Sequence, residues 1–247
     1  MKASIATSLL LAGMCLSVSA IAEDQAHWSY SGPEGPEHWG ELAKDFSTCS
    51  TGKNQSPVNL TGMIEGNLAE IKINYKAGGN EIVNNGHTIQ VNYKPGSMID
   101  VSGHSFELKQ FHFHSPSENT IDGHSYPMEA HFVHADQDGN LAVIAVMFNE
   151  GEANAELEKA WARMPEQAGD HQALKAMVDA NTLLPQQHDY YRFNGSLTTP
   201  PCSEGVWWLV MKQADTASKE QIEKFAHTMH HANNRPLQAV NARMILE

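Results

Sequence analysis

The stretch Gln110-Phe111-His112-Phe113-His114 constrains the fold more than any other part of the chain. Successive side chains of a β-strand point to opposite faces, so Gln110, His112 and His114 share one face and the two phenylalanines share the other. One face of this strand therefore presents imidazoles and an amide, while the other presents aromatic rings to a core. The sequence predicts a strand that is apolar on one side and rich in ligand atoms on the other.

A second run with the same alternation is Met128-Glu129-Ala130-His131-Phe132-Val133-His134. It places Glu129, His131 and Val133 on one face. Because a loop with turn residues joins the two runs, they can pair antiparallel and bring His131 beside the first two histidines. A lone histidine in a strand is more often a core or surface residue, but two on one face with a third opposite predict a metal site. Three neutral imidazoles suit Zn²⁺ and leave its fourth tetrahedral position for water.

The first 22 residues have the features of a signal peptide. A basic start at Lys2 precedes an apolar run over 5–18, and Ala20-Ile21-Ala22 supplies the small residues of a cleavage site. The apolar run is too short to span a bilayer comfortably. We expect cleavage after Ala22, which leaves residues 23–247 as a single domain in the periplasm or secreted.

Cleavage would remove Cys15 and leave Cys49 and Cys202. In an oxidising compartment such a pair favours a disulfide, and two buried free thiols are the alternative. The formal net charge is −13. This charge excludes nucleic acid and, after signal cleavage, anionic membranes as partners, because both would be repelled.

Short strands dominate the rest of the chain, so the sequence predicts one mainly β (α+β) domain, with a large twisted, mostly antiparallel central sheet and a few short peripheral helices. The expected strands are 71–75, 82–93, 98–101, 105–114, 128–134 and 141–148. The run 141–148 is almost continuously apolar and should be buried on both faces. Helices are expected over 152–164 and, from the capping box Ser218-x-x-Gln221, to about Ala232.

The second helix should bury Ile222, Phe225, Ala226 and Met229. It also carries His227, His230 and His231. Because no carboxylate lies beside these histidines, we interpret them as solvated surface residues rather than a metal site.

Other polar residues are candidates for supporting roles at the site. Gln110 and Glu129 each lie two residues before a histidine on the same face, and each can accept the N–H of a ligand imidazole across the strand pair. Glu118 follows the first histidines closely. The run Gly195-Ser196-Leu197-Thr198-Thr199-Pro200-Pro201 predicts a stiff loop that presents a hydroxyl in a fixed direction, with an ordinary surface turn as the alternative.

Together these segments resemble the signature blocks of the α-class carbonic anhydrases, in order, over nearly all of the chain after the signal peptide. The blocks are Gly35-Pro36-Glu37-His38-Trp39, Gln55-Ser56-Pro57-Val58, Asn84-Asn85-Gly86-His87, Phe111-His112-Phe113-His114, Ser117-Glu118-Asn119-Thr120, Glu129-Ala130-His131-Phe132-Val133-His134, the 195–201 run and Asn233-Asn234-Arg235-Pro236. The signal peptide and the cysteine pair resemble the exported bacterial members. The resemblance implies the α-carbonic anhydrase fold and reversible, zinc-dependent hydration of carbon dioxide to bicarbonate and a proton.

The resemblance also implies roles for individual residues. The zinc ligands would be His112, His114 and His131, oriented by Gln110, Glu129 and the backbone near Asn233. Thr198 would accept a hydrogen bond from zinc-bound hydroxide and donate one to ionised Glu118, which aims the hydroxide at the substrate carbon.

The remaining implied roles concern substrate and proton. Carbon dioxide would lie against Val133, Val143, Leu197 and Trp208, and Thr199 would contact bicarbonate. His87 would carry the proton to buffer, through water ordered by Tyr30, Asn85 and Gln90. The expected partners are therefore carbon dioxide, water and bicarbonate, and the family's frequent dimers make a homodimer a further expectation.

Two features depart from a simple pattern. Alternation puts His87 and Gln90 on opposite faces of a strand, so both can line a cavity only if that strand bulges. Phe193 stands where many relatives have a tyrosine, so a hydroxyl near Thr198 is expected to be absent. The resemblance also predicts cis peptide bonds at Ser56-Pro57 and Pro200-Pro201.

Two other functions fit parts of the pattern. His112-x-His114 followed by Glu118 imitates the first motif of cupin-type metal oxygenases, in which the carboxylate binds the metal. The glycines that should bracket that motif are misplaced, because Gly103 lies too far upstream and Gly123 too near downstream. A non-catalytic zinc-binding relative is the second alternative, but such relatives typically lack a ligand histidine.

Overall fold

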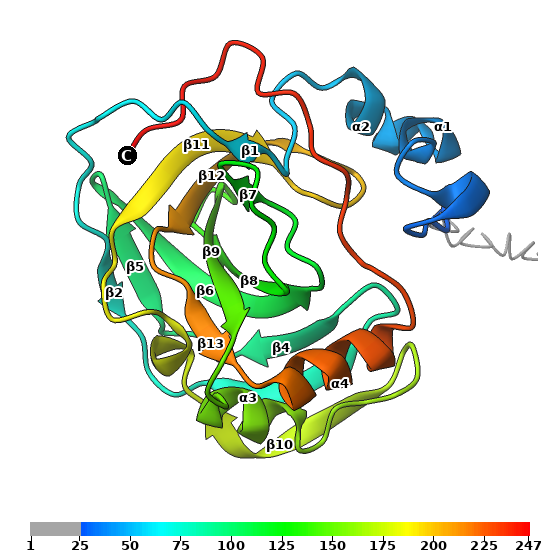
Figure 1. Ribbon diagram of the computed structural model, residues 1–247, viewed down its shortest axis with the longest axis vertical. Helices are drawn as coiled ribbons and strands as arrows, with labels where there is room; N and C mark the ends of the chain where they lie inside the picture. Colours follow the sequence, from blue (N-terminus) through cyan, green and yellow to red (C-terminus); the bar gives the residue numbers. More distant parts are fainter. Residues whose placement is uncertain (1–25) are drawn as a thin grey trace, which may run out of the picture.

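The computed structural model describes residues 26–247 and is organised around one eleven-stranded sheet (Figure 1). The main path of the sheet runs β10-β3-β4-β6-β8-β9-β12-β11, and β2, β5 and β13 join it from the side. The strands of this sheet are β2 Lys72–Asn74, β3 Gly79–Asn84, β4 Ile89–Tyr93, β5 Met98–Val101, β6 His104–His114, β8 Met128–Ala135, β9 Leu141–Glu150, β10 His171–Val178, β11 Tyr190–Ser196, β12 Glu204–Met211 and β13 Asp215–Ala217.

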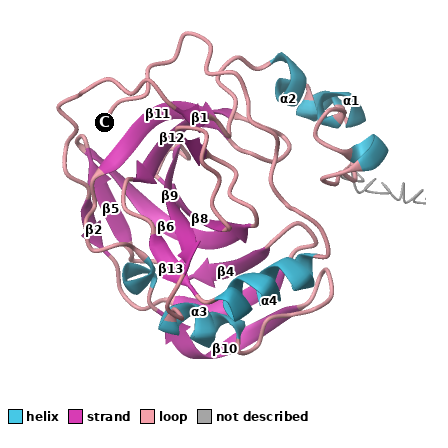
Figure 2. Cartoon of the chain, viewed as in Figure 1, coloured by secondary structure: helices cyan, strands magenta, loops and turns pink. Residues whose placement is uncertain are grey.

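Most strand pairs are antiparallel, and within the large sheet only β12 and β13 run parallel to their neighbour β9. A separate pair joins β1 Asn59–Leu60 and β7 Thr120–Ile121. The helices are short and lie around the sheet (Figure 2). They are η1 Gly32–Glu34, α1 Trp39–Leu42, η2 Lys44–Phe46, α2 Thr48–Thr51, α3 Ala155–Trp161, η3 Ala180–Leu183 and α4 Lys219–Met229. The predicted fold class is confirmed.

The centre of the sheet follows the alternation in the sequence. Two phenylalanines at the end of β6, Phe111 and Phe113, are fully buried and pack with Phe132 of β8 in the larger hydrophobic core. The opposite face of the same two strands carries the histidines, with His112 paired directly opposite His131. The pair of strands β6 and β8 therefore has the apolar core on one face and the polar site on the other.

Strand β9 is buried on both faces, as its continuous apolar run predicts. Ile144, Val146 and Phe148 belong to the larger core, while Val143, Ala145 and Met147 belong to a second core on the histidine side. The second core lies directly beside the polar site. Its residues provide the apolar surroundings of that site.

Three expected elements differ in the structure. The expected strand 82–93 is a hairpin, because β3 ends at Asn84 and the chain turns at Asn85, whose Oδ1 accepts hydrogen bonds from the N–H groups of His87 and Thr88. Helix α3 is shorter than expected, because Asn154 caps it and it ends well before Pro165. The capping box of α4 is confirmed, but Ala226 is exposed rather than buried.

The N-terminal segment is fastened to the loop after β11 by a Cys49–Cys202 disulfide. Both cysteines pack with Trp39 in a small third core. The expected cis peptide bonds at Ser56-Pro57 and Pro200-Pro201 are confirmed, and a third occurs at Ser115-Pro116. Cys202 directly follows the run 195–201, for which the sequence predicts a stiff loop.

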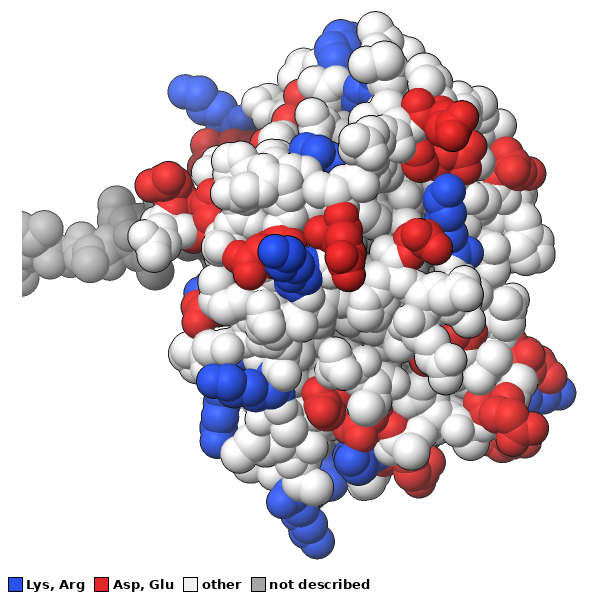
Figure 3. Space-filling model, turned by 90° about the vertical axis from the view of Figure 1, so that its left-hand side faces the viewer, with Lys and Arg blue, Asp and Glu red and all other residues white. Residues whose placement is uncertain are grey.

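Charged side chains of both signs are interspersed over the face shown in Figure 3. Within residues 26–247, no helix has the length and apolar character needed to cross a membrane. The expected signal peptide, residues 1–22, lies outside the described residues.

Candidate metal centre

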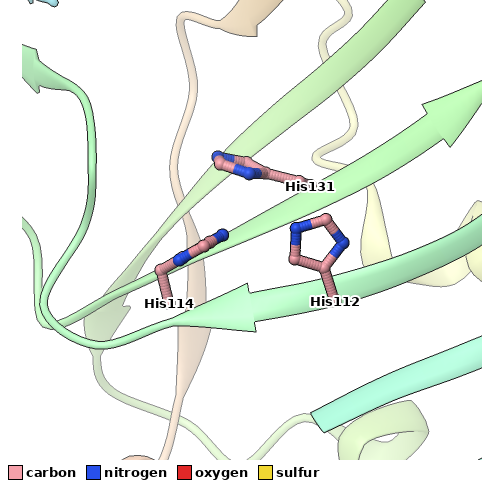
Figure 4. Close-up of side chains that lie close together, drawn as sticks. All are labelled: His112, His114 and His131. Atoms are coloured by element: carbon pink, nitrogen blue, oxygen red, sulfur yellow. The ribbon is translucent and has the colours of Figure 1, made fainter. Parts of the chain in front are cut away.

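Three histidines converge on the polar face of the central strands. His112 and His114 project from β6, and His131 projects from the neighbouring β8 (Figure 4). One ring nitrogen from each lies within 4.8 Å of the others. Elsewhere in the described chain, no group of three or more His, Cys, Asp or Glu side chains brings its ligand atoms this close.

Hydrogen bonds on the outer side of each ring decide which nitrogen faces the centre. His114 Nδ1 donates to the main-chain carbonyl of Asn233 at 2.7 Å, and His112 Nδ1 donates to Gln110 Oε1 at 2.9 Å. Both rings therefore present Nε2. His131 is reversed, because its Nε2 donates to Glu129 Oε1 at 2.9 Å and leaves Nδ1 for the centre.

The expectation that Gln110 and Glu129 accept from a ligand across the strand pair is wrong in that detail. Each accepts from the ring two residues later on its own strand. Side chains at i and i+2 lie on the same face and lean along the strand, so they meet more readily than the sequence reasoning assumed.

The chemistry of this set fits a divalent metal ion. Burial lowers the pKa of all three imidazoles, and for His112 and His131 a neighbouring histidine lowers it further, so the rings are neutral and carry free lone pairs. His114 Nε2 is buried and has no hydrogen-bond partner among the described residues. An unpartnered buried nitrogen is costly unless something binds it, and a metal ion satisfies it.

Glu118 lies beside the three rings without bonding to them. Its Oε2 is 3.5 Å from His114 Nε2 and accepts no hydrogen bond of good geometry, while Oε1 accepts the main-chain N–H of Arg235 at 2.8 Å. Burial raises the pKa of Glu118 to about 8, against the lowering effect of the Arg235 N–H and the nearby Thr198 hydroxyl. Thr198 itself is buried.

Glu129 does more than orient one ring. Its carboxylate also accepts the main-chain N–H groups of Glu118 at 2.7 Å and Asn119 at 2.9 Å, together with the Asn119 side-chain amide at 2.8 Å. It therefore connects the loop that carries Glu118 to the strand that carries His131. Burial raises the pKa of Glu129, and the bonds from Asn119 oppose this.

A cavity of about 130 Å³ leads outward from the histidines. It is lined by Trp28, Tyr30, Asn85, His87, Thr88, Gln90, Gln110, His112, His114 and Thr199. His87 lies in the turn before β4 rather than in a strand, so it reaches the same cavity as Gln90 without the expected bulge. Gln90 pairs directly with His112 on the adjacent strand.

The predicted apolar residues form a row beside the rings. Val133, Val143 and Trp208 are in register across β8, β9 and β12. The Trp208 ring lies 4.8 Å from that of His131, edge to face. Leu197 packs against the same core, and Phe193 stacks on Trp208 at 5.9 Å between ring centroids.

The sequence reasoning missed two supporting residues. Asn119 binds Glu129, and Arg235 binds Glu118 through its main chain while its guanidinium donates to the carbonyls of Ser56 and Cys49. Asn119 and Arg235 both lie inside sequence blocks that carry the family resemblance, and that position is the one sequence feature that could have identified them. Their contacts span long sequence distances, so local pattern alone does not reveal them.

A family profile described as eukaryotic-type carbonic anhydrase matches residues 34–247. The chain belongs to this carbonic anhydrase family. It is 48% identical over 246 residues to a carbonic anhydrase of Pectobacterium carotovorum, with 100% of both chains covered. It is 51% identical to a carbonic anhydrase of Neisseria gonorrhoeae, covering 97% of this chain and 94% of the relative.

A solved structure supports the same assignment. A hyperthermostable carbonic anhydrase from an active hydrothermal vent chimney superposes with a TM-score of 0.88 at 58% identity, covering 90% of this chain and 99% of that one. As a carbonic anhydrase, the chain catalyses the hydration of carbon dioxide, and its three-histidine cluster is the candidate metal centre of that reaction.

Proposed function

We propose that the chain binds one Zn²⁺ through His112, His114 and His131 and uses it to interconvert carbon dioxide and bicarbonate. The observation that carries this proposal is the buried, unpartnered Nε2 of His114, which points at two further ring nitrogens within 4.8 Å. Bound zinc supplies Lewis acidity that makes water nucleophilic at neutral pH, a chemistry for which carbonic anhydrases are the standard example.

Gln110, Glu129 and the Asn233 carbonyl keep the three rings in the orientation that zinc requires. Each accepts the N–H on the outer side of one ring, which fixes its tautomer and limits its rotation. The same bonds make each ring a better electron donor. Because Glu129 also fastens the Glu118 loop, it couples ring orientation to the position of that carboxylate.

Glu118 and Thr198 act as a pair that orients the nucleophile. A cation at the histidines lowers the pKa of Glu118, because a nearby positive charge favours the ionised form. Ionised Glu118 accepts a hydrogen bond from the Thr198 hydroxyl, whose oxygen can then only accept a further hydrogen bond. A nucleophile that carries a proton satisfies that oxygen, and its lone pair is directed away from Thr198.

The apolar row Val133, Val143, Leu197 and Trp208 receives carbon dioxide. A nonpolar molecule gains by leaving water for such a wall, and the wall adjoins His131 directly. Thr199, which lines the cavity, contacts the polar product bicarbonate.

His87 removes the proton that each hydration releases. An imidazole changes charge between about pH 5 and 8 and so both takes and releases a proton near neutrality. Tyr30, Asn85 and Gln90 line the cavity between His87 and the ligand histidines, and they order the water through which the proton moves. The buried Tyr30 hydroxyl has no partner among the described residues, which supports a bond to water.

We propose that the mature enzyme is residues 23–247 and works outside the cytoplasm. The signal-peptide features in the sequence of residues 1–22 and the Cys49–Cys202 disulfide support export to the periplasm or beyond.

A metal-resolved activity assay tests this function. Protein freed of metal by a chelator should not hydrate carbon dioxide in a stopped-flow pH-indicator assay, and one equivalent of Zn²⁺ should restore activity. His114→Ala should neither bind zinc stoichiometrically nor recover. Full activity in the metal-free protein, or none in the zinc-loaded protein, would refute the proposal.

A further inference from the structure

We propose that Asn233 is a positioning residue whose side-chain amide holds His87 and His114 at a fixed separation. Its main-chain carbonyl orients the His114 ring, whereas this further role belongs to its side chain. The role rests on the proposed function, because it concerns how a zinc ligand and the residue that removes the proton are kept in place relative to each other.

Asn233 lies where the end of a strand meets a turn. His114 is the last residue of β6, and His87 lies in the turn between β3 and β4. The ladder between β4 and β6 begins at the pair Gln90 and His112, so the next main-chain groups of β6 extend past the end of β4. Buried main-chain groups at such a position need other partners, because an unpaired one costs about as much as a lost hydrogen bond.

The amide of Asn233 supplies those partners. Its Oδ1 accepts the N–H of Ser115 at 2.9 Å, and its Nδ2 donates to the carbonyl of Phe113 at 2.9 Å. These two bonds lie on either side of His114 along the main chain, as the bonds to a peptide group of a neighbouring strand would. Because the carbonyl of Asn233 also accepts from His114 Nδ1 at 2.7 Å, one residue holds both the backbone and the ring of this ligand.

The same amide also reaches the turn that carries His87. Asn233 Nδ2 donates to the carbonyl of His87 at 3.1 Å, and with two hydrogens it can serve this carbonyl and that of Phe113 together. Thr88, the next residue of the turn, donates from Oγ1 to the same Phe113 carbonyl at 2.6 Å. The turn is therefore tied to the end of β6 at two adjacent residues.

The hydrogen bonds fix the orientation of this amide. Asn233 is completely buried, and its side chain uses the acceptor oxygen and both N–H groups. Reversing the amide would place Nδ2 against the N–H of Ser115 and Oδ1 against two carbonyls. An apolar side chain would leave three main-chain groups without these partners, which is costly in a buried place.

A fixed separation matters for the export of the proton. In the proposed cycle the proton moves outward from the metal centre, where His114 is a ligand, to His87. Each transfer along such a path needs a hydrogen bond of ordinary length, so a displacement of about 1 Å at either end interrupts it. Asn233 fastens both ends to one amide and acts only through the residues that it holds.

The test measures zinc affinity and turnover of Asn233→Ala. Loss of the amide frees the backbone on both sides of His114, so zinc affinity should fall by about ten-fold in competition with a chromophoric chelator. In fully zinc-loaded protein, kcat in weak buffer should fall by about three- to ten-fold while kcat/KM changes much less, because proton export follows the conversion of substrate. Added imidazole buffer should restore kcat.

Two further variants make the result specific. The matched control Asn154→Ala also removes three side-chain hydrogen bonds, but at the start of α3 and outside the cavity. It should lower thermal stability without changing zinc affinity or kcat. Asn233→Asp keeps the shape of the side chain and the acceptor for Ser115 but cannot donate to both carbonyls. It should show the same imidazole-reversible loss of kcat, which decides the matter if the alanine variant does not fold.

An unchanged kcat in either folded Asn233 variant, or an equal fall in Asn154→Ala, would overturn the inference. Unchanged zinc affinity in Asn233→Ala, or a loss of kcat that imidazole does not restore, would do so as well. His87→Ala separates this from the proposed function: if it loses kcat and imidazole restores it, while the Asn233 variants keep full kcat, only the positioning role fails. If zinc-loaded wild type is inactive, the proposed function fails and the positioning role fails with it.

Discussion

Glu129 Oε1 lies 2.9 Å from His131 Nε2, two residues further along the same strand. This bond makes His131 present Nδ1 to the metal centre, whereas His112 and His114 present Nε2. The difference matters because the side chain of His131 comes from the facing strand. His131 on β8 presents Nδ1, the ring nitrogen nearer to its own backbone. His112 and His114 on β6 present Nε2, the nitrogen farther from theirs, and the three nitrogens meet at one point.

The bond predicts unequal consequences for the two side-chain acceptors. Glu129→Ala should weaken zinc affinity by about 10–100-fold, the usual cost of losing a partner of a ligand histidine. Gln110→Ala should cost less, because Gln110 is partly exposed and water can replace it, whereas Glu129 is fully buried and also holds Glu118 and Asn119. Competition with a chromophoric chelator measures both. Equal losses would contradict this ranking.

A second prediction concerns the hydroxyl of Thr198. Thr198→Ala should lower kcat/KM by about 100-fold while zinc content stays at one per chain, because an orienting hydrogen bond is lost but no ligand is. Thr198→Ser keeps the hydroxyl and should retain most of the activity. Hydration kinetics and metal analysis on the same samples provide the measurement. If the serine variant were as impaired as the alanine variant, the hydroxyl would not be responsible.

The three-histidine cluster was predictable because strand alternation is a local property. Residues 110–114 and 128–134 show which side chains share a face, and a single loop between them determines that they pair. The apolar surroundings were also predictable, since a strand buried on both faces has a continuous apolar run. The prediction of the histidine cluster and the prediction of its apolar surroundings both rest on patterns within short runs of sequence, and the first also uses the loop that joins two such runs.

Other features depend on contacts between distant segments. Which nitrogen His114 presents is set by the carbonyl of Asn233, 119 residues after it. The sequence predicts one strand where the hairpin turn holds His87, because apolar residues flank the turn on both sides. His231 lies near Tyr30 only because α4 ends where it does, and no periodicity in the sequence reveals this.

The apolar row predicts a steric effect on substrate. Val143 is buried between Val133 and Trp208, so Val143→Phe should fill the space beside His131 and lower kcat/KM by about 100-fold or more with zinc still bound. Val143→Ile adds only one methylene group and should cost far less. The ratio of the two effects, from initial hydration rates, tests whether carbon dioxide uses this wall. Similar rates for both variants would place the substrate elsewhere.

The disulfide predicts a large contribution to stability. It closes a loop with a sequence separation of 153 residues. In the chain-entropy description, removing it with Cys49→Ser/Cys202→Ser should lower the free energy of unfolding by about 5 kcal/mol. Denaturant titration of zinc-loaded protein measures this. A loss below about 1 kcal/mol would mean that the unfolded chain gains little freedom when the link is removed.

The last prediction concerns His134, a fully buried histidine on the core side of β8. Its Nδ1 donates to the carbonyl of Ala142 at 3.2 Å, and its Nε2 accepts from the Tyr75 hydroxyl. Burial lowers its pKa from 6.5 to about 4, although bonds to the carbonyls of Ala142 and Phe132 act in the opposite direction. The folded protein therefore keeps this ring neutral where the unfolded chain protonates it.

The direction in which stability changes with pH follows from this difference in protonation. Above pH 6.5 both states are neutral and His134 costs nothing; as the pH falls to about 4 the unfolded state gains a proton that the folded state refuses, so stability is lost. The loss reaches about 3 kcal/mol at the lower end of this range. His134→Gln should flatten this part of the stability curve, whereas the exposed control His171→Gln should follow wild type. Chemical denaturation between pH 7 and 4 checks this, and parallel curves for wild type and His134→Gln would show that the buried ring does not contribute to acid sensitivity.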